Sequence, residues 1–246
     1  MIRLLTSIEG RYAHRFASSS QDLEEVQRTR YQVFNVELHE GLDESGALGL
    51  DQDAFDPVCD HLIVEDRETG RVVGTYRLQT GANAAARLGY YSEQEFDFRP
   101  YESIRGQIVE LGRACVLASH RNLFVLGLLW KGIGSYALEH GSRYLMGCSS
   151  LTSQDPAMGA TAYQQLASQW LVEPHWRTLP TPDWQCPLDT LAAEPVMIPK
   201  LLRAYLGLGG KICGPPALDT RFKTIDFLTM VDLDGISAAD RSRFMA

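Results

Sequence analysis

The sequence predicts an α/β protein with a mixed β-sheet, built as one domain over residues 1–246. The first reason is the order of its predicted elements: three strands, a helix, a strand, a helix and late strands make one α/β unit. The second is composition, because 246 residues with 45% hydrophobic side chains are enough to bury a sizeable core. The third is that no repeat, low-complexity tract or change of composition marks a second domain.

The first half is predicted to contain a strand at 12–17, a helix at 21–38, a long loop at 39–60, a hairpin at 61–80 and an irregular stretch at 81–106. Ser19 and Ser20 are both suited to cap the helix, because a serine hydroxyl accepts hydrogen bonds from its first free N–H groups. The apolar stripe of this helix includes Leu23 and also carries Arg30. The loop is rich in glycine and aspartate, and its length is unusual enough to indicate a function.

The second half is predicted to contain strands at 107–117 and 142–150, helices at 123–140 and 156–170, a proline-rich stretch at 174–195, a helix from Pro199 to about 207, and strands near 211–213 and 225–232. Gly141 is placed to end the first of these helices. Asp155 and Pro156 are typical of a helix start, an N-cap followed by proline in the first turn.

The bulk properties indicate a cytoplasmic protein. No run of about 18 apolar residues could span a membrane, and the N-terminus lacks the apolar region of a signal peptide. The five cysteines are odd in number and scattered, which predicts reduced thiols and neither a disulfide framework nor a zinc site. A net charge of −8 argues against a general binder of nucleic acid or anionic membranes.

Glu110 and Arg113 lie within a strongly β-forming segment. Residues three apart on a regular strand face opposite sides of the sheet. Gly112 would permit a β-bulge that brings both side chains to one side and leaves a backbone N–H unpaired. Such a bulge is well suited to polarise a carbonyl group. The alternative is a charged pair on an edge strand.

Asp51, Asp53 and Asp56 crowd one short loop. They do not form a calcium-binding EF-hand, because the glycine at the sixth position and the closing glutamate are missing. A solvated acidic loop is one interpretation. In the other, the carboxylates pair with Arg30 and Arg77 in an ion-pair network that borders an amine-binding pocket.

The turn that contains Ser119, Arg121 and Asn122 precedes the helix at 123–140. The N-terminus of a helix presents free N–H groups that can bind a phosphate, and Arg121 adds a positive charge. The alternative is a simple helix cap. Neither a Walker A motif nor a GxGxxG motif is present.

Together these residues resemble a known group. Four short motifs resemble, in the same order along the chain, the signature of acyl-homoserine lactone synthases. They are Arg30-x-x-x-Phe34, Asp51-x-Asp53-x-x-Asp56, Arg77-Leu78 and Glu110-x-x-Arg113. Asp51 stands where that family usually has glutamate. The ornithine–acyl carrier protein N-acyltransferases, also described as hemolysin-like, are similar to the segments LGRACV, LLWKGIGSYALEHG, YLMGCSSL and PKLLRAYLGLGGKICGPPALD. The resemblance covers about residues 11–232 and is weakest over 172–198.

The resemblance implies a bacterial enzyme with a GNAT fold, a mixed twisted sheet splayed between its fourth and fifth strands with flanking helices. It places the predicted bulge at Gly112 where such folds position a carbonyl-polarising N–H. GNAT enzymes that use acetyl-CoA carry Q/R-x-x-G-x-G/A after this strand, and residues 119–123 do not match it. The resemblance therefore favours an acyl carrier protein as donor, with its phosphopantetheine bound at Ser119, Arg121 and Asn122.

The implied reaction transfers a long-chain, 3-hydroxy fatty acyl group to the α-amine of L-ornithine, the first step of ornithine lipid synthesis. Glu110 is the expected base, directly or through a water, and a backbone N–H near Gly112 and Arg113 the expected oxyanion donor. The residues expected to bind the acceptor or to orient that binding site are Arg30, Phe34, Asp51, Asp53, Asp56 and Arg77. No metal and no cofactor are expected, since the acylated carrier protein is a co-substrate.

The carrier protein is acidic, so the resemblance implies docking on basic residues, with Arg121, Lys131, Arg143, Lys200 and Arg203 as candidates. A lipid-like product implies peripheral contact with the inner membrane. Two alternatives stay open. One is a synthase of acyl-homoserine lactones or other N-acyl amino acids, and the other is a module that binds carrier protein or acyl chains without turnover.

Overall fold

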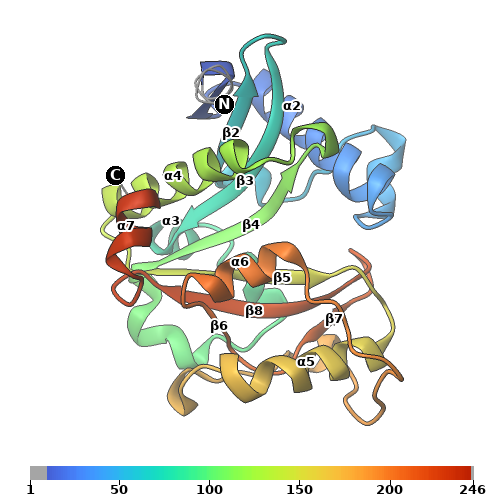
Figure 1. The fold of residues 1–246 in the computed structure, drawn as a ribbon. Helices are drawn as coiled ribbons and strands as arrows, with labels where there is room; N and C mark the ends of the chain where they lie inside the picture. The colour runs from blue at the N-terminus through green and yellow to red at the C-terminus, as the bar shows by residue number, and fades with distance from the viewer. Residues whose placement is uncertain (1–9, 245–246) are drawn as a thin grey trace, which may run out of the picture. The chain divides into compact units, whose positions relative to one another are not determined.

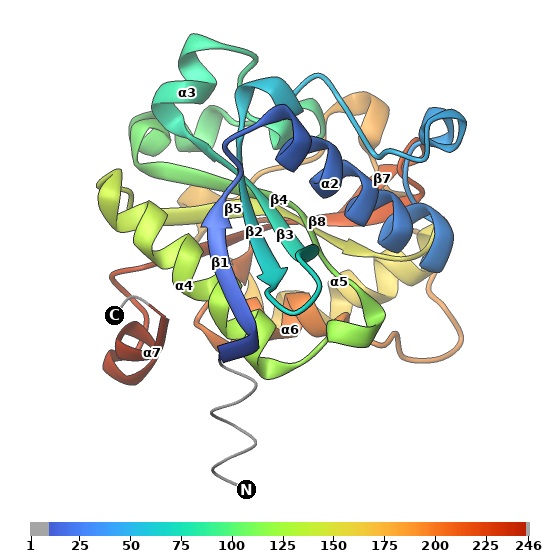
Figure 2. The same ribbon diagram turned by 90° about the horizontal axis from the view of Figure 1, so that it is seen from above.

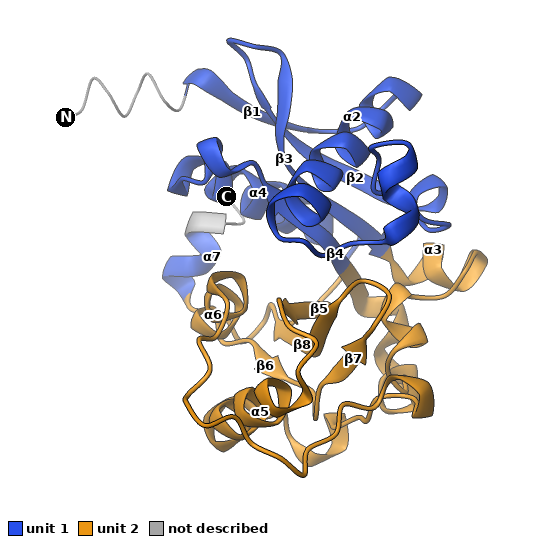
Figure 3. Ribbon diagram, turned by 90° about the vertical axis from the view of Figure 1, so that its right-hand side faces the viewer, with its two compact units in different colours: residues 1–79, 111–141, 238–246 blue, residues 80–110, 142–237 orange. Residues whose placement is uncertain are grey.

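The computed structural model describes residues 10–244, and the chain forms two compact units (Figure 3). Unit 1 comprises residues 1–79, 111–141 and 238–246, and unit 2 comprises residues 80–110 and 142–237. One strand, β4 (Ile108–Val116), begins in unit 2 and ends in unit 1.

Unit 1 is an antiparallel sheet with helices packed on it. Its elements are β1 (Tyr12–Phe16), α2 (Ser20–Tyr31), β2 (Asp60–Asp66), β3 (Arg71–Thr80), the end of β4, α4 (Leu123–Glu139) and α7 (Ala238–Phe244). The last residue of β3 is assigned to unit 2. The strands β1, β2 and β3 lie side by side, and α2 and α4 contact this sheet (Figures 1 and 2). The N–H of Leu117 donates to the carbonyl of Val73 at 2.9 Å, so the end of β4 continues beside β3.

The helices of unit 1 begin at residues whose side chains satisfy free N–H groups. The hydroxyl of Ser19 accepts from the N–H of Asp22 at 3.1 Å and caps α2. The side chain of Asn122 accepts from the N–H groups of Phe124 and Val125 and caps α4. Beyond Tyr31 the helix widens into a π-helical segment, Gln32–Glu37, before the loop begins.

Unit 2 holds the remaining strands and their helices. Its elements are α3 (Gly81–Ala86), the start of β4, β5 (Tyr144–Leu151), α5 (Pro156–Trp170), α6 (Lys200–Gly207), β6 (Lys211–Ile212), β7 (Ala217–Asp219) and β8 (Thr224–Asp232). The strand β5 runs parallel to β4 only over Ile108–Glu110 and antiparallel to β8 over its whole length. The predicted mixed sheet is therefore confirmed, with a short parallel pairing between its fourth and fifth strands.

Most predicted elements are confirmed, and the differences are local. The helix predicted over 21–38 is α-helical only to Tyr31. The stretch at 81–106 contains α3 and two 3₁₀ segments, and neither β7 nor α7 was predicted. The 3₁₀ segments of the structure are Asp43–Ala47, Asp56–Val58, Tyr91–Gln94, Arg99–Gln107, Ala118–His120, Pro174–Trp176 and Pro182–Trp184. The interpretation of residues 1–246 as a single domain stays a prediction.

Two global expectations bear on the environment of the protein. All five cysteines are free thiols in this structure. Among residues 10–244, no helix combines the length and the apolar character needed to cross a bilayer.

Candidate active site

Arg30 is the centre of a buried ion-pair network in unit 1. Its side chain is 0% exposed and points from α2 into the loop that carries the three aspartates. Its Nε and Nη2 donate to Oδ1 and the carbonyl of Asp51 at 2.7 and 2.6 Å. Its Nη1 and Nη2 donate to the two carboxylate oxygens of Asp56 at 2.9 and 2.7 Å. A planar guanidinium matches a carboxylate in this bidentate way, which makes the contact specific as well as strong.

Two further arginines complete the network from the strands. Arg77 on β3 donates to Asp53 at 2.6 Å and to Asp56 at 2.9 Å, and it lies over the ring of Phe55. Arg113 on β4 donates to Asp53 at 2.9 Å and pairs with Asp51 at 3.4 Å. Three positive charges thus face three negative charges, and the loop is fastened to one helix and two strands.

The electrostatics of the network keep Asp53 and Asp56 ionised. Burial alone would raise the pKa of Asp56, but the charges and hydrogen bonds of Arg30 and Arg77 outweigh it and hold that pKa well below its usual range. Burial also opposes ionisation of Asp53, whose pKa is nevertheless lowered by Arg77 and Arg113. The interpretation as a solvated acidic loop is wrong, and the predicted ion-pair network is confirmed. The three carboxylates already form ion pairs with arginines.

Arg113 adopts an unusual backbone. Its φ is +48°, a left-handed conformation that non-glycine residues rarely adopt, whereas Gly112 is not left-handed. The irregularity predicted at Gly112 therefore falls one residue later, where the contacts with Asp51 and Asp53 hold the arginine in place. A Cβ added at Gly112 would meet no atom within 4 Å, so this stretch of β4 has open space beside its backbone.

Glu110 has partners of its own in unit 2. Its side chain is buried, and Oε1 accepts from the N–H and the hydroxyl of Ser92 at 2.8 and 2.7 Å. Its Oε2 accepts from the N–H of Tyr91 at 2.8 Å. The carboxylate is thereby fixed at the start of the 3₁₀ segment Tyr91–Gln94. These contacts come from another part of the chain than the contacts of Arg113 with Asp51 and Asp53.

The remaining predicted residues lie near the start of α4 and at the end of α2. Ser119 is exposed in the 3₁₀ segment Ala118–His120. Arg121 donates to the carbonyl of Val116 and pairs with Glu37. Asn122 caps α4, which was one of the two interpretations of the turn before this helix. Phe34 is buried in the π-helical segment.

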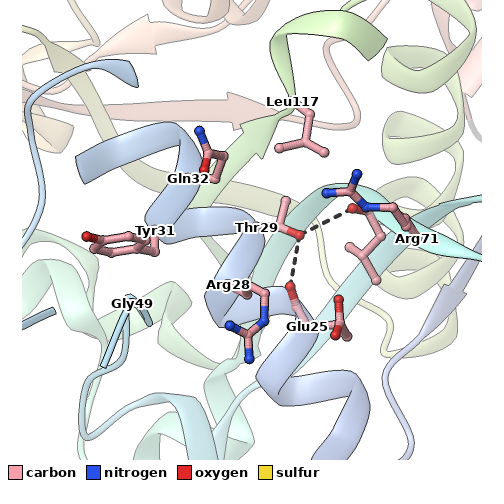
Figure 4. A pocket seen from close by; sticks show the side chains of 9 residues that line it. Glu25, Arg28, Thr29, Tyr31, Gln32, Gly49, Arg71 and Leu117 are labelled. Atoms are coloured by element: carbon pink, nitrogen blue, oxygen red, sulfur yellow. Dashed lines mark hydrogen bonds between the residues drawn. The ribbon is translucent and has the colours of Figure 1, made fainter. Parts of the chain in front are cut away.

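A pocket of about 290 Å³ lies beside α2, next to the start of β3 and Leu117 (Figure 4). It is lined by Glu25, Arg28, Thr29, Tyr31, Gln32, Gly49, Arg71, Val72 and Leu117. The hydroxyl of Thr29 is committed to the carbonyls of Glu25 and Val72. None of the residues predicted to act on a substrate lines this pocket.

A group of acidic side chains in unit 2 was not predicted. Glu95, Cys148 and Asp226 bring their ligand atoms within 4.8 Å of one another. Among residues 10–244 they are the group with the spacing to hold a metal ion. Ser92 belongs beside them, because the thiol of Cys148 donates to its hydroxyl at 3.6 Å. No local sequence pattern could have found this cluster, since its members come from three distant segments.

Comparison with known proteins first defines the class. Residues 29–131 match a family model described as an acetyltransferase (GNAT) domain. The structure of a CoA-dependent acyl-homoserine lactone synthase with SAM and isopentyl-CoA superposes with a TM-score of 0.54 at 17% identity, covering 95% of this chain and 89% of that one. The fold is that of the GNAT acyltransferases, as the resemblance implied.

The curated relatives then define the family. A protein named L-ornithine N(alpha)-acyltransferase from Agrobacterium fabrum is 31% identical over 238 residues, 91% of this chain and 81% of the relative. One of the same name from Rhizobium meliloti is 31% identical over 264 residues, 97% of this chain and 89% of the relative. The chain belongs to the L-ornithine N(alpha)-acyltransferase family.

Proposed function

We propose that this enzyme transfers a long-chain fatty acyl group from acyl carrier protein to the α-amine of L-ornithine, the first step of ornithine lipid synthesis. The observation that carries the proposal is the similarity to ornithine acyltransferases along nearly the whole chain. In the reaction, the α-amine nitrogen attacks the thioester carbon and an amide bond forms. The carbon–sulfur bond breaks, the carrier thiol leaves, and the amine loses a proton.

Glu110 is our candidate for the group that takes this proton, directly or through a water. A free α-amine has a pKa of about 8, so much of it is protonated at neutral pH and benefits from a base. The contacts from Ser92 and Tyr91 fix the orientation of the carboxylate. A positioned base of this kind typically contributes on the order of 10²–10⁴-fold to the rate.

The backbone near Gly112 and Arg113 is our candidate for the oxyanion donor. The left-handed conformation of Arg113 interrupts the regular strand, and the space beside Gly112 leaves room for a thioester carbonyl. One such donor is typically worth about 3 kcal/mol of transition-state stabilisation.

The ion-pair network supports this site by positioning it. Arg30, Arg77 and the three aspartates hold the loop and Arg113 in one arrangement, and we assign them this role rather than direct contact with the acceptor. Phe34 lies at the end of the same helix and is assigned with them. Ser119 and Arg121 are proposed to meet the phosphate of the phosphopantetheine arm, next to the helix that Asn122 caps.

The remaining predictions belong to this proposal. We infer a single catalytic domain over residues 1–246, an acyl donor that enters as a co-substrate, and peripheral contact with the inner membrane through the lipid-like product. Of the candidate docking residues for the acidic carrier protein, Arg121 already pairs with Glu37, and Arg143 with Asp232 and Asp234. The stronger candidates are therefore Lys131, Lys200 and Arg203.

The test is a reaction of purified protein with 3-hydroxyacyl carrier protein and a panel of amino acids, with products identified by mass spectrometry. We expect N-acylornithine. Glu110→Gln should lower kcat on the order of 10²–10⁴-fold. The control Glu102→Gln, an exposed position, should be neutral. The Tm of both variants is measured as well. The amide nitrogen of a glutamine at position 110 cannot accept the hydrogen bond that the N–H of Tyr91 donates to the carboxylate, so this variant can also lose stability. Product with another amino acid alone, or no thiol release, would overturn the proposal.

A further inference from the structure

The acidic cluster of unit 2 lies on one face of its sheet. Asp226 on β8 is paired with Ser150 on β5, and Cys148 lies two residues from Ser150 on the same strand. Directly opposed residues, and residues two apart on a strand, share a face. Glu95 follows the 3₁₀ segment Tyr91–Gln94 and brings its carboxylate against Cys148, whose thiol donates to its Oε2 at 3.5 Å.

The two carboxyl groups of this cluster have no positive partner. Glu95 is 0% exposed and Asp226 is 4% exposed. Across residues 10–244, no lysine, arginine or histidine forms an ion pair with either, and Glu95 Oε1 and Asp226 Oδ1 accept no hydrogen bond. This is the reverse of unit 1, where each buried aspartate faces an arginine. Buried carboxylates without a positive partner are costly, so they point to a proton or a ligand that compensates them.

Burial disfavours the ionised forms of both carboxyl groups. Burial, reinforced by the charge of Asp226, raises the pKa of Glu95 well above its usual value. Burial also raises the pKa of Asp226, to about 6. A cation that binds between two carboxyl groups this close favours their ionised forms.

Two serines relate the cluster to the protein surface and to Glu110. Ser150 is exposed, and its hydroxyl is near enough to Asp226 to lower the pKa of that group, so the Asp226 end of the cluster lies next to the surface. Ser92 connects the cluster to Glu110, because its hydroxyl donates to Glu110 at 2.7 Å and accepts from the thiol of Cys148 at 3.6 Å. An acceptor with two amines joined by a short aliphatic chain offers one amine to Glu110 and the other to the cluster.

We propose that Glu95 and Asp226 bind the side-chain ammonium group of the acceptor amino acid and select a dibasic acceptor over a neutral one. The inference rests on the proposed function, since it presumes that the α-amine of the acceptor reacts near Glu110. The cluster is also a better site for the ammonium group than the loop aspartates of unit 1, because those aspartates already form ion pairs with arginines.

The test compares L-ornithine with L-norvaline, which has the same carbon chain without the side-chain amine. Thiol release from 3-hydroxyacyl carrier protein is measured for the wild type, Glu95→Gln and Asp226→Asn. The matched control is Asp183→Asn, which removes the same charge from an exposed position of unit 2. We expect the two cluster variants to lose kcat/KM for ornithine by roughly 30- to 1000-fold, with norvaline turnover retained and Tm not lowered. The control should keep the ornithine preference.

The outcomes separate the subsite from the reaction. If the wild type makes N-acylornithine and both variants keep its preference for ornithine, the subsite is overturned and the function stands. If the wild type makes no N-acylornithine, the function is overturned and the subsite with it. Calorimetry with zinc chloride is the second measurement: tight one-to-one binding that Glu95→Gln abolishes would make the cluster a metal site and would also overturn the inference.

Discussion

Replacement of Arg30 by methionine tests the buried network most directly. The side chain is fully buried and donates four hydrogen bonds of 2.6–2.9 Å to Asp51 and Asp56. Methionine fills much of the volume but leaves the two carboxylates with an excess negative charge in a buried site. Breaking a buried pair from one side typically costs about 3–5 kcal/mol, and we expect that loss in the free energy of unfolding.

The assay is urea unfolding at pH 7, with Arg28→Met as the matched control. Arg28 lies on the same helix, is 53% exposed and pairs with Glu24 one turn away. Such exposed pairs contribute about 0.3–0.5 kcal/mol, so the control should stay near the wild type. A loss below about 1 kcal/mol for Arg30→Met would refute the description of this network as a buried ion-pair cluster, since the larger cost arises only when the abandoned charges are buried.

The pH dependence of the same variant supplies a second criterion. The pKa of Asp56 is lowered in the folded protein, so its contribution to stability is present above the usual aspartate range and is lost as pH falls through the folded pKa. Arg30→Met removes a main cause of that shift. The gap in unfolding free energy between wild type and variant should therefore be widest near neutral pH and should narrow in acid. A constant gap between pH 7 and pH 3 would contradict the assignment.

Three further predictions concern single positions. Gly112→Ala should leave Tm unchanged, because a Cβ there meets nothing within 4 Å, but should lower kcat if the thioester occupies that space; unchanged kcat would argue against an acyl site at Gly112. Asn122→Ala removes the cap of α4 and should cost about 1 kcal/mol in urea unfolding, with rescue by Asn122→Asp. Asp226→Asn should raise the free energy of unfolding at pH 7, without substrate, by on the order of 2–3 kcal/mol. Burial raises the pKa of the wild-type carboxyl group to about 6, so this group lowers the stability of the folded protein as pH rises through that value. This advantage should vanish near pH 4, and a variant less stable than the wild type at both pH values would contradict it.

Local patterns in the sequence were enough to predict most of the strands and the capped helices, and they offered the ion-pair network as one of two interpretations. Ser19 and Asp155 cap the helices they were expected to cap, because a cap depends on the few residues around it. Arg30 on an apolar stripe, followed by three aspartates, signalled a buried pairing because a lone buried charge is too costly.

The sequence did not predict the features that depend on long-range contacts. The cluster of Glu95, Cys148 and Asp226 exists only because β5 pairs with β8 and a distant 3₁₀ segment packs against them. The left-handed backbone of Arg113 is maintained by partners far along the chain, and nothing in its neighbouring residues encodes it. The strand β7 is three residues long, too short for any periodicity to reveal.

The sharing of partners within the network also restricts how this family can change over time. Asp56 accepts hydrogen bonds from Arg30, Arg77 and Gln27, so no replacement at that position can be compensated by a change at one other residue. We expect intermediates with one member altered to be destabilised, because they carry an unbalanced buried charge. Substitutions that keep charge and approximate length, such as an exchange of aspartate and glutamate at position 51, are the ones that can accumulate one at a time. The loop should therefore diverge as a block, with its charges inherited together, while the surrounding surface varies freely.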